Sequence, residues 1–274
     1  MNPLELRGIT KTYDGFTLGP VDLVVPRGFV MGLVGANGAG KTTLIKTTLG
    51  MALPDAGIVD VVGHDRIGVV HDQPAYVAGW TAAVVGRALA PFYPAWDQRR
   101  FDSLLAWAGI DASKKVKELS RGMGMKLQLA VALSHGAELL ILDEPTSGLD
   151  PLARSQLLDM VADFMTDEAH TVLFSTHITT DLEKIADYVT IIHEGRLLAS
   201  TARDELTDEW RMVHGAASEL DAVRPFVRGL REHAQGWEGL MSTPDTVSLG
   251  RGVVVEKPSL EEIVVHLAKE PSHV

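Results

Sequence analysis

The spacing of apolar and polar residues over the first 50 positions predicts strands followed by a helix. The segments LELRGITKTY at 4–13 and FTLGPVDLVV at 16–25 alternate apolar and polar residues around a turn at Asp14 and Gly15, as an antiparallel pair does. FVMGLV at 29–34 is apolar throughout, which is typical of a strand buried on both faces. A glycine-rich loop follows, and then TTLIKTTLG, which has helical spacing. We therefore expect an antiparallel β portion and then a strand–loop–helix unit.

From residue 137 onward, strand patterns alternate with helical patterns. ELLILDE and TVLFSTH have the composition of strands, and each precedes a segment with helical spacing. YVTIIHEGRLLAS at 188–200 is typical of a hairpin turned at Glu194 and Gly195. This alternation predicts an α/β fold with a mainly parallel sheet covered on both faces. The region 75–136 is richer in helical patterns, one of them with Asp97 as a plausible N-cap, and is predicted to be a helical insertion.

The last 60 or so residues predict a small α+β appendage. TVSLG at 246–250 and GVVVEK at 252–257 are expected to pair as a hairpin around 250–252. SLEEIVVHLAKE begins with a capping box, in which Ser259 is the N-cap and Glu262 stands three residues later, so a final helix is expected. The predicted organisation is a main domain at 1–212, with the helical insertion at 75–136, and an appendage at 213–274.

Composition and charge exclude several classes of function. The 274 residues carry a formal net charge of -11, whereas broad nucleic-acid binding needs a basic face, so no nucleic-acid partner is expected. The chain has no cysteine, which excludes disulfides, thiolate zinc sites and a catalytic thiol. No window reaches the roughly 18–20 apolar residues that span a bilayer, and the N-terminus lacks a secretion signal. We expect a cytoplasmic protein that reaches a membrane only through a partner.

The segment GANGAGKT fits G-x-x-x-x-G-K-[ST], the pattern of a phosphate-binding loop. Glycines allow backbone N–H groups to surround phosphates, and the helix that follows presents its positive end to them. In this pattern the lysine reaches the β- and γ-phosphates, and the hydroxyl of Thr42 binds Mg²⁺. The loop lies between an apolar strand and a helix, which favours this function over a simple glycine turn. The residues expected to bind nucleotide here are Gly35, Ala36, Asn37, Gly38, Ala39, Gly40, Lys41, Thr42 and Thr43.

A second segment, LLILDEPTSGLDP at 139–151, supplies acidic residues at the end of an apolar strand. Asp143 is positioned to hold magnesium through its water shell. Glu144 follows directly and is the candidate general base that polarises the attacking water. Two solvated acids at a strand end would be the alternative, but the upstream phosphate-binding loop disfavours it.

These residues, together with LSRGM at 119–123 and the lone His177 in FSTH, resemble the ATP-binding subunit family of ABC transporters. The resemblance covers about residues 3–210 and includes several motifs in the expected order. It implies a RecA-like P-loop NTPase fold that binds ATP and Mg²⁺ and couples ATP hydrolysis to transport. It also implies membrane subunits as partners at the inner face of the cell membrane. A second ATP-binding subunit is expected as well, as a homodimer, and the small appendage is similar to that of bacterial exporter ATPases.

The resemblance assigns further residues by position. Tyr13 stands where the family stacks an aromatic ring on adenine, although a tyrosine in a strand can also serve packing alone. Ser120, Arg121 and Gly122 lie in the signature loop, which in the family caps the γ-phosphate bound by the other subunit. The segment 147–150 resembles the loop that communicates across the dimer. His177 resembles the switch histidine, which contacts the γ-phosphate and steadies the water together with Glu144.

Two positions depart from the family pattern. The usual signature LSGGQ is here LSRGM, so Arg121 replaces a glycine and Met123 a glutamine. The glutamine that contacts magnesium and the attacking water falls in register with Asp72 in IGVVHDQPAY, and Gln73 stands one residue later. Asp72 can bind a hydrated magnesium from slightly further away. Gln73 can serve if the loop shifts by one residue, and the sequence does not choose between them.

The aromatic residues between 76 and 96 have two interpretations. In the family, this region forms a groove for a short helix of the membrane subunit, and aromatic anchors are common in such interfaces. The same rings could instead form the core of the helical insertion. The residues concerned are Tyr76, Trp80, Phe92, Tyr93 and Trp96.

The sequence favours a transport ATPase over three other functions. A soluble ABC-type ATPase with a non-membrane partner is the main alternative, but such chains usually carry coiled coils, zinc modules, a duplicated head or basic arms, none of which this sequence shows. A GTPase would carry the guanine-reading N-K-x-D motif, which is missing from the sequence. A non-catalytic binding module would not need Lys41, Asp143, Glu144 and His177 together.

Overall fold

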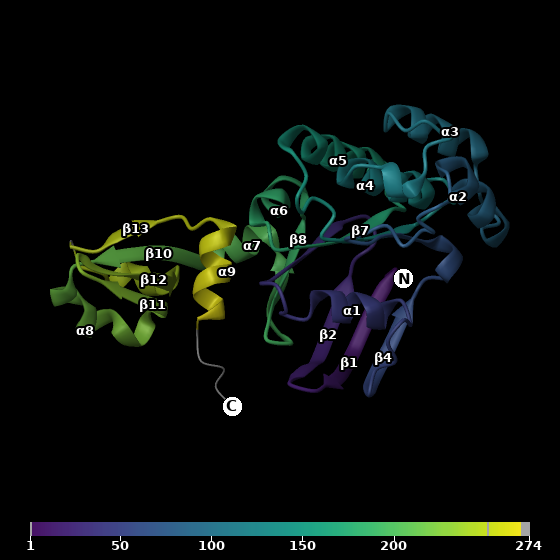
Figure 1. The fold of residues 1–274 in the computed structure, drawn as a ribbon. Coiled ribbons are helices and arrows are strands. Elements are labelled where there is room, and N and C mark those ends of the chain that lie inside the picture. The colour runs from purple at the N-terminus through teal and green to yellow at the C-terminus, as the bar shows by residue number, and fades with distance from the viewer. Residues whose placement is uncertain (1, 251, 270–274) are drawn as a thin grey trace.

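The computed structural model describes residues 2–250 and 252–269 (Figure 1). Its central six-stranded sheet has the order β5-β6-β7-β3-β8-β9, in which β8 and β9 pair antiparallel and all other neighbours pair parallel. The predicted parallel sheet and the hairpin at 188–200 are thereby confirmed. The strands are β3 (Val30–Val34), β5 (Ile67–Val70), β6 (Leu139–Asp143), β7 (Thr171–Thr176), β8 (Tyr188–His193) and β9 (Arg196–Ala202).

Both faces of this sheet are buried because successive side chains of each strand point to opposite sides. Leu140 and Leu142 of β6 belong to one apolar cluster, which also contains residues of α4 (Arg121–Leu133) and α5 (Pro151–Phe164). Leu139 and Ile141 of the same strand belong to a second cluster, with residues of α1 and of the N-terminal strands. A continuously apolar strand thus follows from burial on both faces. The helices against the sheet include α1 (Lys41–Thr48), α5 (Pro151–Phe164) and α6 (Thr179–Ile185).

The N-terminal segment forms a separate antiparallel sheet of order β2-β1-β4, as predicted for its first two strands. Tyr13 and Phe16 face each other across the turn between β1 and β2. The third strand lies in AGIVDV, for which the sequence pattern alone gave no prediction. The bounds are β1 (Leu4–Tyr13), β2 (Phe16–Val25) and β4 (Ala56–Val61).

The region 75–136 contains α2 (Ala82–Leu89), α3 (Gln98–Trp107) and α4 (Arg121–Leu133). These helices share an apolar cluster of their own around the fully buried Phe101. The carboxylate of Asp97 accepts a hydrogen bond from the Arg100 amide, which confirms the predicted N-cap. Helix α4 belongs to both the helical insertion and the core of the central sheet, because Leu127 packs in the insertion's cluster while Leu129 packs in the core cluster. The insertion is therefore connected to the sheet through α4.

The C-terminal part forms a four-stranded antiparallel sheet of order β11-β12-β10-β13, joined to the core by α7. The predicted hairpin of TVSLG and GVVVEK is wrong. Residues 244–248 form a 3₁₀ helix, and β13 pairs with the distant β10 instead, since Val255 lies opposite Val213. An alternating pattern predicts a strand but not its partner. The elements are α7 (Arg203–Glu209), β10 (Trp210–Gly215), α8 (Leu220–Val223), β11 (Arg228–His233), β12 (Gly236–Ser242), β13 (Val254–Glu256) and α9 (Leu260–Ala268).

Helix α9 begins with the predicted capping box, in which Ser259 and Glu262 bond each other's backbone amides. The helix lies between the C-terminal sheet and the core (Figure 1). Its residues Leu260 and Ile263 are buried in the cluster that also contains core residues of β6 and α5, and Glu183 of α6 accepts a hydrogen bond from the Leu260 amide at 3.0 Å. Residue 251 of the expected hairpin and residues 270–274 of the expected appendage lie outside the described residues.

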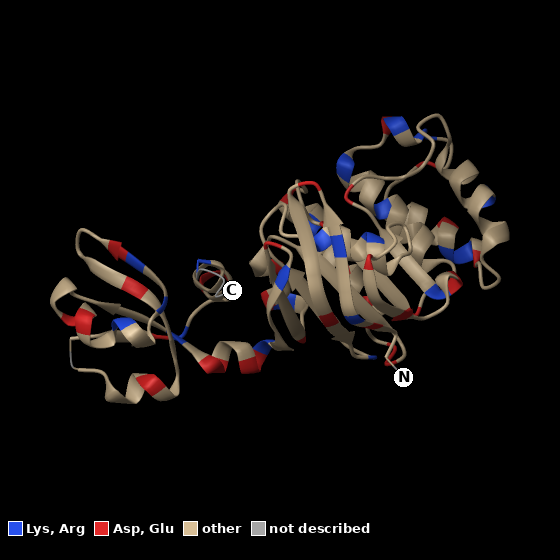
Figure 2. Cartoon of the chain, turned by 90° about the horizontal axis from the view of Figure 1, so that it is seen from below, with Lys and Arg blue, Asp and Glu red and all other residues tan. Residues whose placement is uncertain are grey.

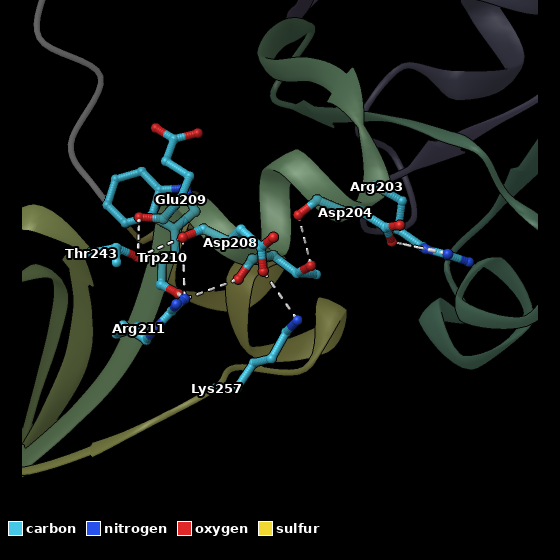
Figure 3. A network of polar contacts seen from close by, with 9 residues as sticks. Arg203, Asp204, Asp208, Glu209, Trp210, Arg211, Thr243 and Lys257 are labelled. Carbon is cyan, nitrogen blue, oxygen red and sulfur yellow. Dashed lines mark hydrogen bonds and ion pairs between the residues drawn. The ribbon is translucent and has the colours of Figure 1, made fainter.

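Polar contacts fix the point where β10 leaves α7 (Figure 3). One guanidinium nitrogen of Arg211 donates to the carbonyl oxygens of Thr207 and Asp208, in the last turn of α7, and of Trp210, the first residue of β10. The Thr243 hydroxyl donates to the Asp208 carbonyl oxygen, and Lys257 forms an ion pair with the Asp208 carboxylate at 3.1 Å. Carbonyl groups at a helix C-terminus lack intrahelical partners, so these donors complete the helix end.

Acidic and basic residues are interspersed over both parts of the described chain rather than gathered by sign (Figure 2). The net charge of -11 is therefore spread widely over the surface.

We predict that Ile263→Ala destabilises the whole chain, because its side chain is fully buried in the cluster shared with the core. Replacing a buried isoleucine by alanine typically lowers the free energy of unfolding by about 2–5 kcal/mol. Val265→Ala is the matched control, since this residue lies on the same helix but is 42% exposed. Urea unfolding followed by circular dichroism checks both variants. Equal, small losses for the two would contradict a shared core.

Candidate functional site

The loop between β3 and α1 depends on glycine at several positions. A Cβ atom at Gly35 would clash with the Ile192 carbonyl oxygen, and Gly38 and Gly40 have φ angles of 83° and 113°. Only glycine adopts such backbone conformations at low cost. Helix α1 begins directly after the loop, at Lys41, so its free N–H groups point toward the loop. The sequence pattern for an anion-binding loop therefore corresponds to an anion-binding geometry.

The Lys41 ammonium group is almost fully buried at the base of this loop. It donates to the carbonyl oxygens of Gly35 at 2.7 Å and Ala36 at 3.2 Å. It also forms an ion pair with the Glu144 carboxylate, 3.1 Å away. A buried lysine needs such partners because removing its charge from water is costly. The result is a fixed positive charge beside the loop amides.

Asp143 lies at the end of β6, where two hydroxyl groups bond its carboxylate. Thr42 donates to one oxygen at 2.8 Å, and Ser175 of β7 donates to the other at 3.2 Å. Burial raises the pKa of Asp143, these two hydrogen bonds oppose the rise, and the negative charge of Glu144 adds to it. Thr42 and Asp143, both predicted magnesium ligands, are thus in direct contact.

Glu144 and His177 follow two neighbouring parallel strands and meet at the carboxyl end of the sheet. The His177 Nδ1 atom lies 2.7 Å from a Glu144 carboxylate oxygen. Glu144 has a φ angle of 52°, an uncommon conformation for a residue with a side chain. Such conformations cluster at functional sites, where the surrounding contacts hold them. One carboxylate therefore contacts both Lys41 and His177.

A cavity of about 260 Å³ opens beside these groups. Asp72 is part of its lining, whereas Gln73 is outside it. Phe16 also lines the cavity and lies against Gly40, whereas the predicted adenine-binding Tyr13 is 46% exposed and outside the lining. Phe16 was not among the predicted site residues, although its place directly after the turn was a usable signal. The cavity is lined by Phe16, Asn37, Gly38, Gly40, Lys41, Thr42, Thr43, Asp72 and Glu144.

The signature residues form a second surface. Ser120 caps α4, since its hydroxyl oxygen accepts a hydrogen bond from the Met123 amide at 3.3 Å. The Arg121 side chain lies against Gly148, so the signature loop and the segment 147–150 are adjacent. Together they line a cavity of about 480 Å³, which shares no lining residue with the cavity at the phosphate-binding loop. The predicted site residues thus form two separate groups within one chain, with Ser120, Arg121 and Gly122 in the second.

Comparisons with known proteins identify the family. Residues 18–147 match the ABC transporter family. The chain is 31% identical over 216 residues to the bacitracin transport ATP-binding protein BcrA of Enterococcus faecalis, covering 74% of this chain and 70% of the relative. It is 33% identical over 252 residues to the Nod factor export ATP-binding protein I of Cupriavidus pinatubonensis, covering 85% and 77%. The chain belongs to the ATP-binding subunits of ABC transporters.

A solved structure, described as the ATP-binding subunit of an ABC transporter, matches with a TM-score of 0.68 and 29% identity, covering 74% of this chain and 91% of that one. The predicted P-loop NTPase fold and the predicted family are confirmed. The protein is an ATPase subunit of this family. The relatives favour transport over the alternative of a non-membrane partner. Among the residues that the structure describes, none of the helices has the length and apolar character needed to cross a membrane.

We predict that Asp143→Asn stabilises the chain at neutral pH when nucleotide and metal are removed with EDTA. Because burial raises the pKa of Asp143, the folded chain binds a proton there more tightly than the unfolded chain. The parent therefore loses stability as the pH rises from the ordinary value of 3.8 through the raised value. Asparagine does not ionise, and its side-chain oxygen can still accept from Thr42.

Urea unfolding at a series of pH values measures this effect. The stability difference between the variant and the parent should grow with pH across that window and then level off. A difference that is constant over the whole series would contradict the proposed burial effect.

Proposed function

We propose that this chain hydrolyses Mg·ATP with Glu144 as the general base, and that two copies form the working unit. The observation that carries the proposal is the position of the Glu144 carboxylate, 3.1 Å from Lys41 Nζ and 2.7 Å from His177 Nδ1 beside the cavity of the phosphate-binding loop. A charged donor, a carboxylate base and an imidazole converge at one point there. Phosphoryl transfer needs such positioned groups more than it needs covalent chemistry.

The loop amides at 35–43 hold the phosphates, with Lys41 as the fixed positive charge. The Thr42 hydroxyl and the Asp143 carboxylate fit Mg²⁺, because this ion prefers oxygen ligands and keeps most of its coordination for water and phosphate. The distance of 2.8 Å between the Thr42 hydroxyl oxygen and an Asp143 carboxylate oxygen supports this assignment. Asp72 lines the same cavity and is the better candidate for the third contact, whereas Gln73 stays the alternative. Bound magnesium would neutralise charge on the phosphates.

Glu144 accepts a proton from the attacking water while the water oxygen forms a bond to the γ-phosphorus and the bond to ADP breaks. His177 contacts the γ-phosphate and holds the Glu144 carboxylate. For the adenine base of ATP, we propose that the exposed ring of Tyr13 stacks on it. Phe16 lines the cavity and packs against Gly40, so it supports the loop from the adjoining strand.

The separation of the signature surface from the phosphate-binding loop supports a homodimer. Ser120 caps a helix whose N-terminus can hold an anion, yet its cavity is distinct from that of Lys41 in the same chain. In a two-fold dimer, Ser120, Arg121 and Gly122 of each copy would complete the site of the other copy. ATP then joins the two copies, and hydrolysis separates them.

The transport role gives the chain its location. We propose that it is cytoplasmic and bound to the inner face of the cell membrane through the membrane subunits. Export is the favoured direction, because relatives such as the Nod factor protein are named for export. We further propose an ATPase domain at 1–212, with the insertion at 75–136, and an appendage at 213–274. The C-terminal sheet itself starts at Trp210, within β10.

The structure separates the aromatic residues of the insertion into two groups. Tyr76 and Trp96 pack against the insertion's own cluster, and Tyr93 stacks on His135 with ring centroids 4.1 Å apart. Trp80 and Phe92 are 37% and 75% exposed. We propose that these two exposed rings line the groove that receives the membrane subunit, because aromatic anchors carry much of the binding energy of interfaces.

Glu144→Gln should reduce ATP hydrolysis by about 100-fold or more, because it removes the general base while keeping the shape of the side chain. ATP binding should persist, and the variant should accumulate as a nucleotide-bound dimer. Phosphate release and size-exclusion chromatography with ATP measure the two effects. Glu194→Gln is the matched control, since Glu194 also has a positive φ angle, 46°, but lies at the β8–β9 turn. Unchanged turnover in Glu144→Gln would remove this residue from its proposed role.

Trp80→Ala and Phe92→Ala should each weaken capture of the membrane subunits by about tenfold while the melting temperature stays within about 2 °C of the parent, since truncating an exposed anchor costs binding but little folding stability. Trp96→Ala is the contrasting variant and should lower the melting temperature, because this ring packs on Phe101. Co-purification from detergent and differential scanning calorimetry give the two readouts. Reduced stability with intact capture would reject the groove.

A further inference from the structure

We propose that Asp181 is a positioning residue that holds the Glu144 and His177 side chains in the relative position that hydrolysis needs. Its carboxylate has no solvent exposure and lies on α6, four residues after His177. A fully buried carboxylate is rare unless charged or polar partners satisfy it. This inference rests on the proposed catalytic roles of Glu144 and His177.

Both oxygens of the Asp181 carboxylate are bonded to other segments. The Thr146 hydroxyl donates to one oxygen at 2.6 Å. The Arg154 Nε atom donates to the other, also at 2.6 Å, and a further nitrogen of this guanidinium donates to the Thr180 hydroxyl at 2.8 Å. The two bonds to the Asp181 carboxylate are short, and the carboxylate itself is fully buried, so their geometry is strongly held. The carboxylate therefore joins the segments after β6 and β7.

The position of Thr146 makes this bond relevant to the reaction. Thr146 stands two residues after Glu144, and Asp181 stands four residues after His177. The Thr146–Asp181 bond therefore links the two segments on one side of the Glu144–His177 contact. On the other side, toward the strands, the Glu144 amide donates to the Ser175 carbonyl oxygen at 2.9 Å, so the same two segments are bonded on both sides of the contact. The positive φ angle of Glu144 requires such fixation, because strained residues persist only where their surroundings hold them.

The Asp181 carboxylate also fixes a third segment, the loop at 147–150. Arg154 lies on the first turns of α5, and Asp150 caps this helix by accepting from two backbone amides. The loop is thus fixed at one end by Thr146 and at the other by the helix that carries Arg154. Because the same loop borders the signature surface, Asp181 also ties the two groups of site residues together.

Thr146→Val tests the inference, since it removes the hydroxyl but leaves the Asp181–Arg154 ion pair intact. We expect kcat for ATP to fall about tenfold with KM within about twofold, because misplacement of catalytic groups affects the chemical step more than nucleotide binding. Thr146→Ser should restore kcat. Thr190→Val is the matched control: Thr190 is equally buried and its hydroxyl is also bonded, but to Ser200 and Met31. The control should lower the melting temperature similarly and leave kcat unchanged.

The same substitution in a His177→Ala chain separates a positioning role from a general effect on stability. In a His177→Ala chain, the contact that Thr146 is proposed to align is already gone, so Thr146→Val should cause no further loss of the residual activity. Unchanged kcat in Thr146→Val, or the same tenfold loss in both backgrounds, would overturn the inference. If Glu144→Gln retains full turnover, the proposed function itself fails. If Glu144→Gln abolishes turnover while Thr146→Val does not reduce it, only the role of Asp181 fails.

Discussion

The lateral pairing of β3, β7 and β6 is the constraint on which the site depends. In this register Val34 lies beside Thr176 and Asp143 lies beside Ser175, so all three strands end at the same level. The loop that starts at Gly35, Glu144 and His177 directly follow the ends of β3, β6 and β7, and Asp143 is the last residue of β6. Because parallel strands place their carboxyl ends at one edge, segments more than 100 residues apart along the chain meet there.

Burial on both faces keeps that register, and polar contacts at the strand ends refine it. The apolar clusters on the two sides of the sheet leave no freedom to shift a strand without exposing its side chains to the wrong surroundings. At the edge, the hydroxyls of Thr42 and Ser175 hold Asp143, and Asp181 holds the segments beyond Glu144 and His177. The apolar core thus places the reacting groups approximately, and hydrogen bonds set their final geometry.

Much of the fold could be predicted, and the misses have a common cause. Strands β3, β6 and β7 of the core, the hairpin at 188–200 and the caps at Asp97 and Ser259 follow from local spacing and local hydrogen bonds. The pairing of β13 with β10, the third strand of the N-terminal sheet and the place of Phe16 in the cavity were missed. Each of these depends on a contact between segments distant in sequence, about which local patterns carry no information.

For the site, the sequence by itself determined which residues are the candidates for the chemistry, because a loop that wraps phosphate needs its glycines, lysine and hydroxyl at fixed spacing. It also determined the family. Only the tertiary structure decided that Asp72 rather than Gln73 lines the cavity, which aromatic rings are exposed, and that the signature residues lie apart from Lys41. It alone decided the role inferred for Asp181, since a buried carboxylate acquires its partners from other segments only when the chain is folded.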